Sequence, residues 1–139
     1  MANDLRSFRL QLDRAYERKV RQRVAQVTRW VALEALRRVI LKSPVDKGRF
    51  KGNWQTALSV RPDGVLDVVD PSGSATLAEG SRNISQLRPY EVVYLANNVP
   101  YARKLEDGHS QQAPQGVVAV SVAELQAFFN NIPADQDIP

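Results

Sequence analysis

The sequence contains no cysteine and only one histidine among its 139 residues. Without cysteine, a disulfide framework and a cysteine-ligated zinc site are both excluded. The histidine, His109, is a close neighbour of Asp107 and Ser110, but three residues on one short loop rarely converge as a catalytic triad. A single histidine without a second nitrogen or sulfur ligand is also a poor zinc site. We therefore expect no catalytic residue, no metal site and no cofactor, and hence no enzyme.

Aromatic residues make up only 7% of the chain, which argues against a single-strand nucleic-acid binder built on base stacking. No apolar run approaches the roughly 20 residues of a membrane span, so no membrane partner is expected. The first ten residues lack the apolar core of a signal peptide, and the sequence contains no glycine-rich phosphate-binding motif. Together with the lack of cysteine, these absences predict a protein that is made and assembled in the cytoplasm.

Positive charge is concentrated at one end of the chain. The first 42 residues hold 11 Lys and Arg against 4 Asp and Glu, whereas residues 43–139 hold 8 against 11. A basic segment of this kind predicts an anionic partner, either nucleic acid or an acidic protein surface; a solvated helix face is an equal alternative. Such a ridge binds phosphate backbones without reading base sequence. The candidate contacts are four arginines: Arg14, Arg18, Arg21 and Arg23.

The same basic segment predicts one long helix, or two abutting helices, over Asn3–Leu41. Apolar residues recur every three or four positions from Leu5 to Val39, and neither glycine nor proline interrupts the pattern before Pro44. At 1.5 Å per residue, this helix is about 55–60 Å long. A domain of this size does not need that length, so we expect part of the helix to pack on another subunit.

The rest of the chain predicts an antiparallel sheet with helices, which makes the expected fold class α+β. Turn residues separate several short runs rich in valine, leucine and aromatic residues, as is typical of strands. These runs indicate about four strands: Trp54–Val60, Val65–Val69, Glu91–Ala96 and Val117–Val120.

Two helices complete the expected body. Pro100 favours the start of a short helix after the central strand. Ser121 and Glu124 have the spacing of a capping box, which predicts a C-terminal helix packed on the sheet. The expected single domain, 1–132, thus joins a basic helix (1–42) to an α+β body (43–132), and the last seven residues (133–139) form a flexible tail.

The segment Asp70–Pro89 separates the second predicted strand from the third. It is rich in serine, glycine and proline and has no clear periodicity, with room for a short helix around Ala75–Glu79. Loops of this length are uncommon inside a compact domain unless they are functional or disordered. We therefore expect this segment to order on a partner.

Two blocks of the sequence resemble a known family. The first, Ser43–Trp54 (SPVDKGRFKGNW), is similar to the family form S-P-V-D-T-G-x-[FL]-[RK]-x-[NS]-W, with Lys47 in place of the usual threonine. The second, Val93–Gly116, contains VYLANNVPYA and LEDGHSQQAPQG and is similar to V-Y-[IL]-x-N-x-x-P-Y-A-x-x-[LI]-E-x-G-x-S-x-Q-A-P-x-G. The chain thus resembles the tail-completion, or neck, proteins that join head and tail in tailed bacteriophages and prophages.

This resemblance implies a structural virion protein without enzyme activity. Its subunits form a homo-oligomeric ring, commonly a hexamer, between the head-side connector or stopper and the tail terminator or tail tube. DNA passes through the ring and makes only transient, non-specific contact with it, so the expected location is the neck of the virion. If the ring interpretation holds, we expect the second block to place a loop at a subunit contact. The candidate interface residues are Tyr101, Leu105, His109, Gln111 and Gln112.

Two alternatives stay open at this point. A tail terminator or stopper ring protein belongs to the same region and shares the design of helix plus sheet, so sequence alone does not set the place in the stack. A basic nucleic-acid-binding module would use the same four arginines. It would bind duplex DNA with an affinity that falls steeply as salt rises.

Overall fold

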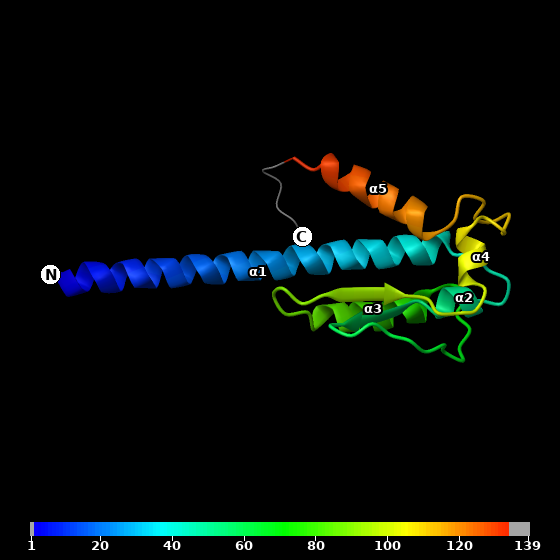
Figure 1. Cartoon of the computed structure of the whole chain (residues 1–139), viewed down its shortest axis with the longest axis horizontal. Helices are drawn as coiled ribbons and strands as arrows, with labels where there is room; N and C mark the ends of the chain where they lie inside the picture. The colour runs from blue at the N-terminus through cyan, green and yellow to red at the C-terminus, as the bar shows by residue number, and fades with distance from the viewer. Residues whose placement is uncertain (1, 134–139) are drawn as a thin grey trace.

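The computed structural model describes residues 2–133, and Figure 1 shows one long helix with the rest of the chain gathered around its C-terminal half. The long helix, α1, spans Ala2–Lys42. The other elements, in the order α2, β1, α3, β2, α4 and α5, span Arg49–Gly52, Gln55–Leu58, Ser74–Ser85, Val93–Ala96, Ala102–Glu106 and Val118–Asn130. The fold is α+β with a long N-terminal helix. The predicted flexible tail covers residues 133–139, of which only residue 133 is among the described residues.

Helix α1 is a single uninterrupted helix about 60 Å long. It ends at Lys42 because Ser43 precedes Pro44, whose ring disfavours helical geometry in the residue before it. The Ser43 hydroxyl donates to the carbonyl oxygen of Val39 at 2.5 Å and accepts a hydrogen bond from the indole Nε1 of Trp54 at 2.7 Å. The end of α1 is therefore tied to the start of the sheet.

The sheet has two strands, so the prediction of about four strands is wrong. β1 and β2 pair antiparallel, with Gln55 opposite Ala96 and Leu58 opposite Val93. They are shortened forms of the first and third predicted strands. The other two predicted strands are not formed in the described part of the chain, each for a different physical reason: Val65–Val69 and Val117–Val120.

The first of these lies in an extended segment, Ser59–Asp70, which we call the strap. Hydrogen bonds from side-chain amides, and not from a neighbouring strand, hold the strap to the body. Asn53 accepts from the backbone N–H of Leu66 at 2.7 Å and donates to its carbonyl at 3.2 Å, and Gln55 donates to the carbonyl of Gly64 at 2.7 Å. Because these amides bond the backbone as a strand would, the segment is extended without forming a ladder.

The second, Val117–Val120, forms the first turn of α5. Ser121, the predicted N-cap, lies inside the helix, where its hydroxyl donates to the carbonyl oxygen four residues earlier at 2.6 Å. The prediction that this helix packs on the sheet is also wrong, since α1 lies between α5 on one side and the sheet with α3 on the other (Figure 1). Trp30 of α1 makes edge-to-face contacts with Phe128 and Phe129, with ring centroids 5.7 and 5.0 Å apart.

The segment that we expected to order on a partner contains α3, a helix of 12 residues that packs within the chain on α1 and β1. Asp70 caps this helix, because its carboxylate accepts from the backbone N–H of Thr76 at 2.8 Å and from that of Gly73 at 3.2 Å. Partial burial acts to raise the pKa of Asp70, but hydrogen bonds from Thr76, Gly73 and Ser72 outweigh it and lower the pKa. The segment is thus long because it contains a capped helix.

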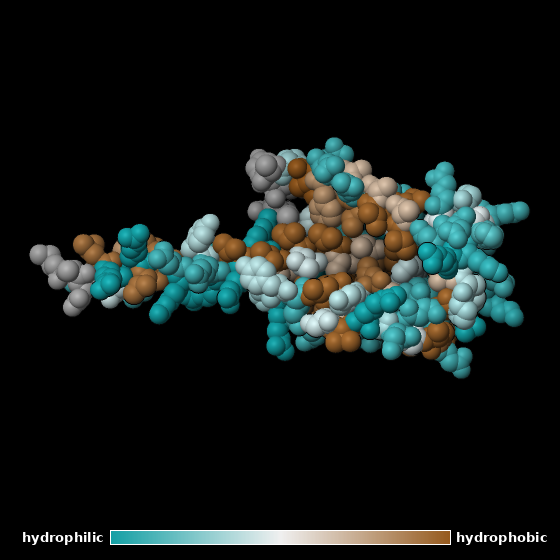
Figure 2. All heavy atoms as spheres, in the orientation of Figure 1, coloured by the Kyte–Doolittle hydropathy of each residue, from teal (hydrophilic) through white to brown (hydrophobic). Residues whose placement is uncertain are grey.

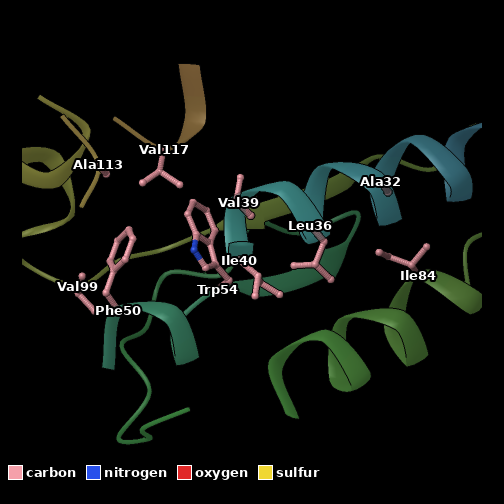
Figure 3. Close-up of a cluster of buried hydrophobic side chains, with 10 residues drawn as sticks. All are labelled: Ala32, Leu36, Val39, Ile40, Phe50, Trp54, Ile84, Val99, Ala113 and Val117. Carbon is pink, nitrogen blue, oxygen red and sulfur yellow. The ribbon is translucent and has the colours of Figure 1, made fainter. Parts of the chain in front are cut away.

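The hydrophobic core lies along the C-terminal half of α1, where α2, α3 and residues flanking the two strands pack on it. In Figure 3, Leu36 of α1 and Ile84 of α3 lie in the space between the two helices, and Trp54 lies beside Ile40. Val117, at the start of α5, is also almost fully buried in this cluster. Val99 and Ala113 of the second block are buried in the same cluster, so both sequence blocks contribute side chains to one core.

Candidate functional site

The N-terminal half of α1 stands clear of the body. Every residue from 4 to 23 is exposed, and we call this stretch, about 30 Å long, the arm. Figure 2 shows apolar side chains interrupting its polar surface. Four large apolar residues recur at steps of three and four and form the apolar stripe: Leu5, Phe8, Leu12 and Tyr16, which are 73%, 59%, 54% and 71% exposed. Side chains at these steps share one face of a helix, so the arm presents a continuous apolar surface to solvent.

Three of the four predicted arginines lie together on the arm. Arg14, Arg18 and Arg21 are separated by four and three residues and, at 100° per residue, lie on roughly the opposite side from the apolar stripe. Arg23 lies on the side of the stripe and donates to the side-chain oxygen of Gln26 at 3.1 Å. The arm therefore has an apolar side and a basic side, and the role of the arginines stays a prediction.

The predicted interface residues of the second block are divided between the core and the surface. Tyr101 and Leu105 are half-buried against the core, and the Tyr101 ring centroid lies 6.5 Å from that of Phe50. His109 and Gln111 are exposed at the tip of the loop. The structure thus gives the first two a packing role and leaves the second two accessible, while their part in an interface stays a prediction.

Gln112 joins the two sequence blocks within the chain. Its side-chain oxygen accepts from the backbone N–H of Val45 at 2.8 Å, and its side-chain NH₂ donates to the Val45 carbonyl at 3.0 Å. The amide therefore pairs with a backbone residue as a strand would, across 67 positions of sequence. The hydroxyl of Ser110 accepts from the backbone N–H of Gln112 at 3.2 Å and so helps to fix the loop.

Glu106 caps α5 from a distant segment, a role that the sequence did not predict. Its carboxylate accepts from the backbone N–H groups of Val117, Val118 and Ala119 at 2.8–2.9 Å. Partial burial acts to raise the pKa of Glu106, but these three hydrogen bonds outweigh it and lower the pKa. The first amides of a helix have no partner inside it. Because Glu106 supplies that partner, α5 begins at Val118, before the predicted N-cap Ser121. A cap from a distant segment leaves no signal in the sequence near the helix, although Gly116 indicates a turn just before α5 begins.

Replacing Glu106 with glutamine is expected to lower the free energy of unfolding at pH 7 by about 1–2 kcal/mol, because a charged cap is lost. The lowered pKa means that the carboxylate stabilises the fold above its ordinary value of 4.5 and that this contribution is lost as pH falls through the folded-state pKa. Wild type and variant should therefore converge in acid in denaturant titrations. Asp107→Asn, at an exposed neighbour, is the matched control; an equal effect there would contradict the capping role.

The described residues contain no cluster of three His, Cys, Asp or Glu side chains that could hold a metal ion. None of the helices within residues 2–133 is both long and apolar enough to cross a membrane. Comparison of the chain with protein-family models, curated proteins and solved structures finds no match. What this chain does must therefore be inferred from its residues, above all from the exposed arm.

Proposed function

We propose that this chain is a structural subunit of a ring at the head–tail junction of a tailed bacteriophage, where it joins the head-side connector to the tail and leaves a passage for DNA. The observation that carries the proposal is the arm, a helix with an exposed apolar stripe that no element of its own chain covers among the described residues. The resemblance of the two sequence blocks to neck proteins adds the biological setting.

An uncovered arm is energetically unfavourable for an isolated subunit. Burying a large apolar side chain contributes roughly 1.5–3 kcal/mol, so a partner that covered the four stripe residues would gain substantially from them. A helix of about 20 residues without tertiary contacts is only marginally stable in water. Assembly would therefore both bury the stripe and stabilise the arm, which favours self-association over a monomer.

The scaffold and the basic side of the arm also agree with this role. Gln112 and Glu106 fix the second block onto the first block and onto α5, so the two blocks form one rigid body. Arg14, Arg18 and Arg21 face away from the stripe, so they would stay accessible after it is buried. Weak, sequence-independent attraction to phosphates at such a face would let DNA pass without holding it.

Light scattering across a wide range of protein concentration tests the proposal. We expect a closed oligomer with a mass that is a fixed multiple of 15.6 kDa. The double substitution Leu12→Asp and Tyr16→Asp should return the protein to a monomer with unchanged thermal stability of the body, because buried charges in the stripe carry a large cost. Leu41→Asp, at an exposed position on the same helix, is the matched control. A wild-type monomer at every concentration would contradict self-assembly.

A further inference from the structure

The strap is a second exposed apolar surface on the same chain. It belongs to no helix or strand of the described structure, and in Figure 1 it crosses the side of the body opposite α5. Five large apolar side chains are exposed along it: Val60, Val65, Leu66, Val68 and Val69. Exposed apolar side chains gathered on one short segment mark a candidate interaction site.

The charges of the strap and the arm are opposite. The strap carries three aspartates against one arginine, and the arm carries seven Lys and Arg against three Asp and Glu. Two arms packed stripe to stripe would bring together Arg9, Lys19 and Arg23 of each copy, which lie on the stripe side of the helix, and this is unfavourable. An arm packed on a strap would instead match apolar with apolar and basic with acidic.

The arm cannot reach the strap of its own chain. Helix α1 has no glycine or proline that could bend it, and Figure 1 shows the arm leading away from the body that carries the strap. A contact between the two surfaces therefore has to join different copies. Unless two copies exchange arms reciprocally, such a contact is heterologous, and heterologous contacts generate closed rings when their rotation closes.

We infer that the arm of one copy docks along the strap of a second copy; this inference rests on the proposed function and names the surface through which the ring assembles. The arm is about 30 Å long, and the 12 residues of the strap could span at most about 40 Å if fully extended, so the strap can accommodate much of the arm. Arg9 and Lys19 lie on the stripe side of the helix, four residues after Leu5 and three after Tyr16. The apolar stripe covers those apolar side chains of the strap that face the arm, and these two cations lie within reach of its aspartates.

Cross-linking tests this contact directly, because the chain has no cysteine of its own. A chain with Leu12→Cys is co-assembled with a differently tagged chain with Val69→Cys, treated with a short bis-maleimide and separated on a denaturing gel. We expect the heterodimer of the two tagged chains to be the main product. Ala123→Cys, on the exposed side of α5, replaces Val69→Cys as the matched control and should give at least about tenfold less heterodimer.

Light scattering of the untreated protein distinguishes two kinds of failure. If the protein is an oligomer but Leu12→Cys cross-links to itself or to Ala123→Cys in preference to Val69→Cys, the arm–strap contact is wrong and the proposed ring function stands. If the protein is a monomer at every concentration, the proposed function and this inference are both wrong.

A charge exchange provides a second measurement that does not depend on cross-linking geometry. Asp63→Arg with Asp67→Arg in the strap is expected to raise the concentration for half-assembly about tenfold or more. Arg9→Glu with Lys19→Glu in the arm should do the same. All four changes in one chain should restore assembly toward the wild type; failure of the fourfold variant to recover would overturn the pairing of arm with strap.

Discussion

Replacing Leu36 with alanine is expected to lower the free energy of unfolding by about 3–5 kcal/mol, which is a large part of the stability of a small domain. Leu36 is 0% exposed and lies in the core between α1 and α3. Near Leu36 both helices are held in place, α1 at its C-terminal end by the bond between Ser43 and Trp54 and α3 by the Asp70 cap, so they cannot close fully onto the space that the side chain leaves. Denaturant unfolding measures the loss directly. Leu41→Ala, on the same helix but 79% exposed, should change stability by less than about 0.5 kcal/mol.

A double-mutant cycle with Gly80 shows whether the loss comes from this packing. A Cβ on Gly80 of α3 would overlap the Cδ2 atom of Leu36, and it would lie 2.9 Å from the hydroxyl oxygen of Thr56. Gly80→Ala should therefore destabilise the wild type, whereas in the Leu36→Ala background it should cost less or stabilise, because alanine favours a helix by about 1 kcal/mol over glycine. The contact with Thr56 is common to both backgrounds and cancels. Additive effects would show that the two residues do not share this space.

The parts of the fold that the sequence predicted are those with a strong local pattern. Helix α1 extends one residue further at each end than the predicted Asn3–Leu41, because its apolar spacing and its stop before Pro44 are local signals. The prediction of the two paired strands is also confirmed, since Trp54–Val60 alternates and Val92–Ala96 is a continuous apolar run. The wrong predictions have a different origin, because they depend on contacts between distant residues. Asn53 bonds the strap backbone in the way a neighbouring strand would, and Glu106 caps α5 from a distant segment. Neither contact can be read from neighbouring residues.

The candidate site was predicted only in part for the same reason. The surplus length of the basic helix was visible in the sequence, and so was the ridge of Arg14, Arg18 and Arg21. Within the strap, the sequence predicts Val65–Val69 as a strand of the sheet, although this run does not alternate apolar and polar residues as a half-buried strand does. Its exposed side chains became evident only when the fold placed the segment outside the sheet. The acidic charge of the strap, which is opposite to that of the arm, can be counted directly from the sequence.

Replacing Gly48 with alanine is expected to destabilise the protein by about 3 kcal/mol or more. Gly48 has a φ of 89°, and a left-handed conformation costs an L-residue with a side chain roughly 1–2 kcal/mol. In addition, a Cβ there would overlap the backbone nitrogen of Pro71. That backbone cannot easily move, because the N–H of Asp70 donates to the Gly48 carbonyl at 2.9 Å and the Asp70 carboxylate caps α3. Thermal and denaturant unfolding measure this loss.

Gly64→Ala is the matched control within the strap, because a Cβ on Gly64 would meet no atom within 4 Å. Its stability should stay within about 0.5 kcal/mol of the wild type. The two glycine variants also test assembly, because Gly48 fixes the end of the strap on which a neighbouring arm is proposed to dock. At temperatures where both variants are folded, we expect Gly48→Ala to assemble less well than Gly64→Ala, because its strap end is displaced. Equal assembly, despite a lower stability of Gly48→Ala, would show that the C-terminal end of the strap takes no part in the contact.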